Sequence, residues 1–348
     1  MTRFVSHRIA APSKLLDETP WERWERRALS GPALLAATPL FLASLPITLA
    51  ATALYDAHHR NRWTTTRFAA ALGVNLGMHT AALAGVFTAW LVGGRWAGQS
   101  PQRELAMEHR LQNAWAQITW NLCAHLYQLD LEVRGTEHAK PGPVLILPRH
   151  ASIIDTILPL LLISEADGLR LRYVMKRELL WDPVLDAIGH RWPTAFVRRG
   201  TRSAHEVEHV LHLADELGAS DAIVLFPEGT RFSREKRQHI LTGLRSDPER
   251  FEKAHRLRHV LPPHPGGVLA LLDALDIDIV FVAHTGLEGA NHFEDLLAGS
   301  LIGAKVKVEM WRVAHRDIPV ESSARIAWLE EQWREVDRWI DEHRNASA

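Results

Sequence analysis

Apolar and charged positions divide the chain of 348 residues into an apolar N-terminal part and a longer part built from short alternating segments. No charged residue occurs from 28 to 55 or from 68 to 94, and each run exceeds the roughly 20 residues needed to cross a hydrocarbon core. We therefore predict a membrane hairpin of two hydrophobic helices over 28–95, after a charged segment at 1–27. Length alone is compatible with a hairpin that spans the bilayer and with one that enters a single leaflet.

Helical periodicity flanks the remaining part of the chain. Apolar residues from Leu105 to Leu129 recur every three or four positions and predict an amphipathic helix within 96–130. This spacing suits a helix on the membrane surface and equally one that packs on the domain that follows. Apolar residues with the same spacing predict a C-terminal amphipathic helix within 321–348 that closes the core.

Residues 131–320, between these two helices, alternate apolar runs with helical patterns. Strands are predicted at 144–148, 171–175, 194–198, 222–226, 277–283 and 304–313, and helices at 153–164, 201–217 and 264–274. Such an alternation is typical of an α/β fold with a mixed, mostly parallel sheet flanked by helices. Together with the hydrophobic hairpin that precedes it, this sheet defines the expected architecture.

Charge and cysteine content exclude several classes of protein. Lys and Arg number 40 and Asp and Glu 41, so the net charge of −1 gives no field that would attract nucleic acid. The single cysteine, Cys123, excludes a disulfide framework and a metal site of several cysteine ligands. Arg60, Arg62 and Arg67 lie in the connector of the hairpin, whereas its two flanks carry more basic residues. By the positive-inside rule we expect an inner (cytoplasmic) membrane protein whose folded domain faces the cytoplasm.

A titratable pair follows the strand predicted at 144–148. His150 is the second residue after this strand, and Asp155 lies five positions further on. Ligands bind at the carboxyl ends of strands in open α/β sheets, and a neutral imidazole there can accept a proton near pH 7. A carboxylate on its other nitrogen would fix the tautomer. The alternative is that Ser152 and Asp155 form a capping box and only satisfy a helix N-terminus.

The same spacing occurs a second time, at His125 and Asp130. That pair lies within and at the end of the amphipathic pattern, without a turn where a substrate would enter, and we interpret it as structural. Beside His150 there is no nucleophile-elbow pattern with Ser or Cys. The nucleophile is therefore expected to be a hydroxyl of the substrate.

Two further polar clusters follow predicted strands. The run Glu228-Gly229-Thr230-Arg231 comes after the strand at 222–226, where glycine allows close backbone approach and the arginine fork suits a phosphate. Arg198 and Arg199 end the strand predicted at 194–198, where an ordinary exposed turn is the simpler interpretation. Three polar clusters at one edge of a sheet together favour a common site.

With these blocks the sequence resembles the glycerolipid acyltransferase family, which includes the 1-acylglycerol-3-phosphate acyltransferases. The His and Asp separated by four residues match its first block, Arg199 takes the place of the arginine in its second, and Phe226-Pro227-Glu228-Gly229-Thr230-Arg231 matches its third letter for letter. The stretches 259–263 and 317–319 resemble the eukaryotic-type branch with lysophosphatidate and lysocardiolipin acyltransferases. Arg149 departs from the usual Asn before the histidine, and the strand at 277–283 lacks the proline of the fourth block.

The resemblance implies transfer of a fatty acyl group from a thioester, acyl-CoA or acyl carrier protein, to the free hydroxyl of a lysophospholipid in the membrane. The most similar reaction converts 1-acylglycerol-3-phosphate into phosphatidate. His150 would be the general base and Asp155 its orienting partner. The residues implied in binding the acceptor and its phosphate are Arg199, Glu228, Gly229, Thr230 and Arg231. No metal, organic cofactor or nucleic acid is implied. An acyltransferase for another lyso-lipid and a non-catalytic, membrane-anchored lipid-binding protein stay open as alternatives.

Overall fold

The computed structural model describes residues 18–93, 101–165, 168–190, 193–198 and 204–345. In these residues seven strands form one sheet in the order β1-β7-β6-β2-β5-β3-β4. Their bounds are β1 Asp130–Arg134, β2 Val144–Pro148, β3 Arg170–Lys176, β4 Thr194–Val197, β5 Asp221–Val224, β6 Asp278–Thr285 and β7 Lys305–Val313. Neighbouring strands are parallel except β6 and β7, which pair antiparallel. The predicted α/β class with a mixed, mostly parallel sheet is confirmed.

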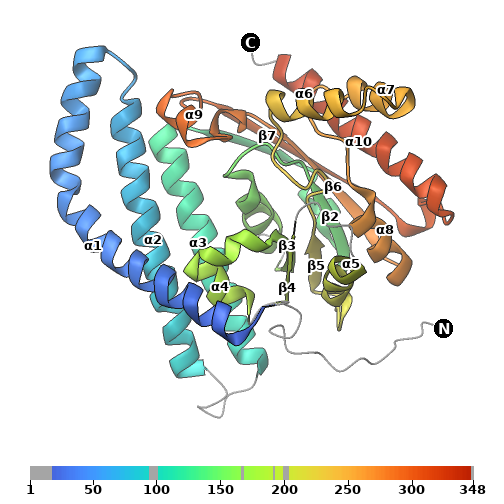
Figure 1. The fold of residues 1–348 in the computed structure, drawn as a ribbon, viewed down its shortest axis with the longest axis horizontal. Helices are drawn as coiled ribbons and strands as arrows, with labels where there is room; N and C mark the ends of the chain where they lie inside the picture. The colour runs from blue at the N-terminus through green and yellow to red at the C-terminus, as the bar shows by residue number, and fades with distance from the viewer. Residues whose placement is uncertain (1–17, 94–100, 166–167, 191–192, 199–203, 346–348) are drawn as a thin grey trace.

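Helices cover both faces of this sheet (Figure 1). On one face, α3 (Pro101–Tyr127) and the segment after β2 contribute to the apolar cluster that contains Val144 and Ile146. On the other face, helices α5, α8 and α10 contribute to the cluster that contains Leu145 and Leu147. β2 is therefore buried along its whole length, as its uninterrupted apolar run predicts. The bounds of the other helices are α4 Pro183–Gly189, α5 Ala204–Leu211, α6 Arg234–Gly243, α7 Pro248–Arg256, α8 Pro265–Ala274, α9 Phe293–Leu297 and α10 Ser322–Asn345.

The N-terminal hairpin consists of α1 (Pro20–His59) and α2 (Thr64–Gly93), which lie side by side (Figure 1). α1 begins earlier than predicted, inside the charged segment, because Thr19 and Glu22 form a capping box at its start. Both helices are long and apolar enough to cross a membrane by length and composition, and little of either apolar stretch is buried. The predicted pair of hydrophobic helices is confirmed, whereas the limits of the domains stay a prediction.

Both ends of the hairpin contact the rest of the chain. Near the start of α1, Arg26 forms an ion pair with Asp186 of α4. At the connector between α1 and α2, Arg62 donates a hydrogen bond of 3.2 Å to the carbonyl of Ile302, just before β7. Between these contacts α2 packs along α3. The connector and the N-terminal flank therefore both reach the folded domain, although the charge count places them on opposite sides of a bilayer.

The predicted amphipathic helices correspond to α3 and α10, and α3 packs on the sheet through the buried residues Ala116 and Trp120. The helix predicted at 153–164 is present from Asp155 to Ser164, but it is irregular. It starts as the 3₁₀ turn η4 (Asp155–Ile157) and ends, from Leu160 to Glu165, as a π-helix. The apolar spacing predicts the helix and does not distinguish these forms from a regular α-helix.

Sequence patterns also missed elements that are short or polar. β1 alternates exposed and half-buried residues at the edge of the sheet, so its apolar signal is weak. Helices α6 and α7 lie in the basic stretch between 228 and 259 and bury little apolar surface, which hides their period. Of the helix predicted at 201–217, α5 and a 3₁₀ turn at His212–Ala214 are observed, and residues 201–203 lie outside the described residues.

Candidate active site

His150 and Asp155 are in direct contact just past the carboxyl end of β2. His150 Nδ1 lies 2.9 Å from Asp155 Oδ1, and the aspartate is fully buried whereas 14% of the histidine side chain is exposed. An ionised carboxylate only accepts hydrogen bonds, so Nδ1 carries the proton and Nε2 keeps its lone pair. The ring of Phe226 packs beside the imidazole with 4.6 Å between centroids. The imidazole is therefore held in one tautomer and is accessible from outside.

The second oxygen of Asp155 binds backbone. Oδ2 accepts hydrogen bonds from the N–H groups of Ala151 at 2.6 Å and of Ser152 at 2.7 Å. Burial by itself would raise the pKa of this carboxyl, but the imidazole of His150, assisted by that of His284, holds the pKa below its usual range. The two roles that the sequence left as alternatives, capping a turn and orienting an imidazole, are thus both present in the geometry, one on each oxygen.

Glu228 binds the backbone of His150. This side chain is buried, with Oε1 accepting from the N–H of His150 at 2.8 Å and Oε2 accepting from the N–H of Leu261 at 2.7 Å. Burial outweighs these two donors and raises the pKa of Glu228 to about 8. The carboxylate therefore joins the backbone of the His150 turn to the loop that precedes α8. Any effect of Glu228 on the acceptor pocket, which stays a prediction, would be exerted through these backbones.

The loop that follows Glu228 adjoins the same turn. The N–H of Phe232 donates to the carbonyl of His150 at 2.7 Å, which fixes the two segments together. Gly229 has a φ of +64°, in the left-handed region that favours glycine. Arg231 Nη1 donates to the carbonyl of Asn291 at 2.7 Å, and the hydroxyl of Thr230 accepts from Lys236 Nζ at 2.9 Å. Two cations therefore lie in this loop and in the first turn of α6, close to the titratable pair.

A family model described as Acyltransferase matches residues 130–284, from the first residue of β1 to the next-to-last residue of β6. This range contains the pair of His150 and Asp155 and the whole run Glu228–Arg231. A 1-acyl-sn-glycerol-3-phosphate acyltransferase of Limnanthes alba is 30% identical to the chain over 130 residues. Residues 130–284 are thus similar to the Acyltransferase family. The predicted resemblance is confirmed.

The extent of each similarity differs. The match with the Limnanthes alba protein covers 36% of this chain and 43% of the relative, so the chain spans less than half of that protein's length. The crystal structure of the 1-acyl-sn-glycerophosphate (LPA) acyltransferase PlsC from Thermotoga maritima shares 12% identity. It covers 77% of this chain and 96% of its own, with a TM-score of 0.47.

In this acyltransferase domain Arg149 is a buried structural cation. Its guanidinium is fully buried and donates to the carbonyls of His284 at 2.7 Å and His259 at 3.0 Å. It also forms an ion pair of 2.6 Å with Glu288, and the cation holds the pKa of that carboxyl well below its usual value despite burial. The sequence marked Arg149 only as a departure from the family pattern. Its partners are more than 100 residues away in the sequence, and the fold brings them to the same edge of the sheet.

The backbone N–H groups that follow His150 are already bound. Ala151 and Ser152 donate their N–H groups to Asp155, Ile153 donates to the carbonyl of Ala290, and Ile154 donates to the hydroxyl of Ser152. The N–H groups of residues 151–154 therefore already have acceptors, three within the turn and one in the segment of Ala290. To bind an oxyanion, any of them would have to share or give up such a bond.

Two other predicted features of the acyltransferase lie apart from this cluster. Arg199 lies outside the described residues, and its neighbour Arg198, at the end of β4, donates its N–H to Glu206 at 3.1 Å. His125 lies near the end of α3, and Asp130 begins β1 at the edge of the sheet. The acceptor role of Arg199 and the structural role of the second pair stay predictions.

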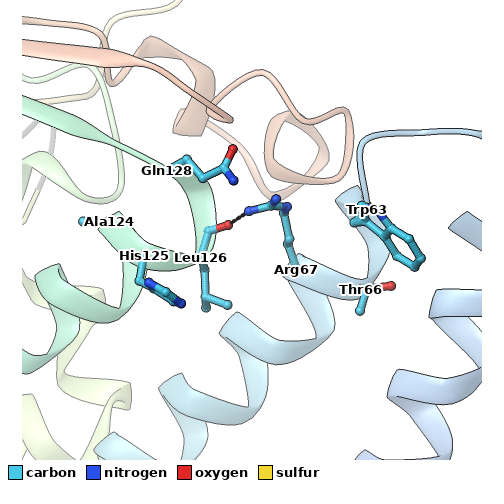
Figure 2. A pocket seen from close by; sticks show the side chains of 7 residues that line it. All are labelled: Trp63, Thr66, Arg67, Ala124, His125, Leu126 and Gln128. Carbon is cyan, nitrogen blue, oxygen red and sulfur yellow. Dashed lines mark hydrogen bonds between the residues drawn. The ribbon is translucent and has the colours of Figure 1, made fainter.

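A cavity of about 520 Å³ opens between the start of α2 and the end of α3 (Figure 2). Its lining comprises Trp63, Thr66, Arg67, Ala124, His125, Leu126 and Gln128. Figure 2 shows the guanidinium of Arg67 directed at the carbonyl of Leu126, to which it donates. None of these residues belongs to the cluster around His150. Across the described part of the chain, no three His, Cys, Asp or Glu side chains gather to hold a metal ion.

Proposed function

We propose that this chain transfers a fatty acyl group from a thioester donor to the free hydroxyl of a lysophospholipid, with 1-acylglycerol-3-phosphate as acceptor and phosphatidate as product. The contact of 2.9 Å between His150 and the buried Asp155, beside the Glu-Gly-Thr-Arg loop, carries this proposal. It positions a base without a nucleophile of its own. The relative from Limnanthes alba is named for the same acceptor.

The chemistry follows from the tautomer of His150. Nε2 takes the proton of the acceptor hydroxyl as its oxygen attacks the thioester carbonyl, and the imidazolium forms while Asp155 stabilises it. The new C–O bond forms a tetrahedral intermediate. When this intermediate collapses, the C–S bond breaks and the proton passes from Nε2 to the departing thiolate. The products are a diacyl lipid and a free thiol, so the atoms balance without a covalent enzyme intermediate.

The phosphate of the acceptor is assigned to the cations beside this base. The guanidinium of Arg231 uses Nη1 on the carbonyl of Asn291, which fixes the orientation of its planar fork. Lys236 Nζ is bound to Thr230 and to the carbonyl of Arg231, so it adds positive charge to the same loop. Arg199 is the third cation of the proposal, on the basis of the family's second block.

An acceptor screen tests the reaction. Purified protein in detergent, labelled acyl-CoA and a panel of lysophospholipids and other lyso-lipids would be incubated, and the labelled lipid identified. We expect phosphatidate from lysophosphatidate, with slower transfer to acceptors whose phosphate carries a headgroup. Transfer to a lyso-lipid without a phosphate would contradict the assigned acceptor, and binding of lipid without transfer would favour the lipid-binding alternative. Repeating the screen with acyl carrier protein thioesters identifies the donor.

The same screen with Arg231→Ala tests the phosphate site. We expect the KM for lysophosphatidate to rise about 10- to 100-fold, as loss of a hydrogen bond to a charged group predicts, while the KM for acyl-CoA stays unchanged. Arg234→Ala is the matched control because Arg234 is exposed three positions further on. Equal effects of the two substitutions on the acceptor KM would show a general charge effect and no specific site.

We further propose that the hairpin of α1 and α2 lies along the bilayer surface and enters a single leaflet, with the acyltransferase domain in the cytoplasm. Three large apolar residues of α1, Leu40, Ile47 and Leu54, are 73%, 77% and 74% exposed. This surface favours burial in lipid. Contacts at both ends of the hairpin support the arrangement, since Arg62 at the connector and Arg26 at the flank touch the same domain.

Cysteine labelling distinguishes this arrangement from a hairpin that spans. In a Cys123→Ser background, His58→Cys reports on the connector and Glu25→Cys on the N-terminal flank, both at exposed positions. We expect a membrane-impermeant maleimide to label the two variants from the same side of sealed membrane vesicles. Labelling from opposite sides would establish a spanning hairpin. Detergent-permeabilised vesicles, in which both variants should react, control for accessibility.

A further inference from the structure

His284, the next-to-last residue of β6, lies against the carboxylate of the proposed catalytic pair. Its imidazole is fully buried, and Nε2 lies 3.4 Å from Asp155 Oδ2 and 3.2 Å from the carbonyl oxygen of Arg149. We infer that His284 is a positioning residue, a second imidazole that locks Asp155 in the orientation in which it holds His150. This inference rests on the proposed function, because it concerns the efficiency of the same base.

The two oxygens of Asp155 face different numbers of hydrogen-bond donors. Oδ2 is close to three donors, the N–H groups of Ala151 and Ser152 and the Nε2 of His284, whereas Oδ1 faces His150. A buried carboxylate needs such donors to offset the loss of water. Because Oδ2 is occupied from both the turn and the sheet, the carboxylate cannot rotate without breaking bonds. Oδ1 is thereby reserved for the imidazole of His150.

The tautomer of His284 is set by its surroundings. Both atoms near Nε2, a carboxylate oxygen and a carbonyl oxygen, only accept hydrogen bonds, so Nε2 carries the proton. Nδ1 is buried and has no hydrogen-bond partner among the described residues. It therefore keeps a lone pair, since a proton on Nδ1 would be a buried donor without an acceptor. His284 serves as a neutral donor and not as a second base.

His284 and Arg149 also bind each other reciprocally. The guanidinium of Arg149 donates to the carbonyl of His284 at 2.7 Å, while the imidazole of His284 points back at the carbonyl of Arg149. The residue before the base and the residue beside its carboxylate are thus joined in both directions. This pairing fixes the end of β6 against the turn after β2, which explains how the sheet transmits its rigidity to the pair.

Removal of this donor tests the inference. The ionisable and charged groups that face the His284 imidazole are Asp155, His150, Arg149 and Glu288. In His284→Leu we expect kcat to fall about 10- to 100-fold, the range for a lost hydrogen bond to a buried charge, with the KM of both substrates unchanged. The acid limb of the pH profile of kcat/KM should move to higher pH. Without the His284 donor, the negative charge of Asp155 is less neutralised and stabilises the imidazolium of His150 more strongly.

Two further variants separate positioning from folding. His284→Gln places an amide N–H₂ near the position of Nε2 and should recover most of kcat and the original acid limb. His239→Leu, at an exposed histidine of α6, should change neither. If His284→Leu lowers only the folded fraction, and turnover per folded molecule and the acid limb stay as in the unsubstituted protein, His284 is merely structural and the inference is wrong. If His150→Ala retains full transfer, His150 is not the base and the inference about His284 fails with it. If the unsubstituted protein transfers no acyl group in the acceptor screen, the proposed function itself fails.

Discussion

Replacement of His150 by alanine is expected to lower kcat for acyl transfer by about 10²- to 10⁴-fold, the contribution of a general base. The imidazole is the only group of the pair that is exposed, and its Nε2 lone pair is what would receive the acceptor's proton. Because the side chain makes one polar contact and packs beside Phe226, its loss should leave the fold intact. Release of thiol from acyl-CoA in the presence of lysophosphatidate measures the effect.

The chain contains its own control for this variant. His125 has the same spacing to an acidic residue but lines the cavity between α2 and α3, away from the turn after β2. His125→Ala should retain the activity of the unsubstituted protein. Full transfer by His150→Ala would end the catalytic interpretation. Equal losses in the two variants would instead indicate a general requirement for the fold or for membrane attachment.

Replacement of Asp155 by asparagine is expected to lower kcat by about 10³- to 10⁴-fold, as loss of the carboxylate does in other His-Asp pairs. The amide oxygen would still accept the hydrogen bonds that the N–H groups of Ala151 and Ser152 donate. The amide N–H₂ would then face Nδ1 of His150. Two donors cannot face each other, so the imidazole would adopt the other tautomer and present N–H, and no lone pair, to the acceptor hydroxyl.

Turnover per folded molecule separates this effect from loss of stability. Asp155→Asn should also unfold more easily, by about 1–3 kcal/mol, because a buried charged acceptor is lost. Since the pKa of Asp155 is lowered by folding, this difference should be full above pH 3.8 and shrink as the pH falls below it. Ser152→Ala removes only a turn hydroxyl and should cost stability alone. If Asp155→Asn keeps its turnover per folded molecule, capping is the residue's whole role.

Local sequence patterns were sufficient for the parts of the molecule that depend on neighbours in the chain. β2 was predicted with its observed limits because a strand buried on both faces must be apolar throughout. The acyltransferase blocks were likewise readable, since each follows a strand directly. The helix predicted at 153–164 was found at Asp155–Ser164, but its 3₁₀ start and π-helical end were not predicted, because apolar spacing does not distinguish them from a regular helix.

The supporting residues of the site were beyond local patterns for the same reason. His284 sits in an apolar strand, and nothing near it in the sequence signals a catalytic carboxylate. Arg149 was noted only as a departure from the family pattern, and its full burial was not predicted. Glu228 was recognisable as part of a family block, but its contacts with the backbone N–H groups of His150 and Leu261 were not. Each of these roles depends on which strands are neighbours in the sheet. The order of strands cannot be predicted from the pattern of any single segment.

The reversal of direction between β6 and β7 has a consequence for how the membrane and the site communicate. Because the two strands are antiparallel, the chain between them, residues 286–304, crosses the edge of the sheet where β6 ends. Its Asn291 carbonyl holds Arg231, and its Ile302 carbonyl binds Arg62 at the connector of the hairpin. This connection thus contacts both the connector of the hairpin and the loop of the proposed phosphate site. If the hairpin is held in lipid as proposed, a displacement of α1 and α2 by bilayer thickness or curvature is expected to shift Arg231 without motion of His150.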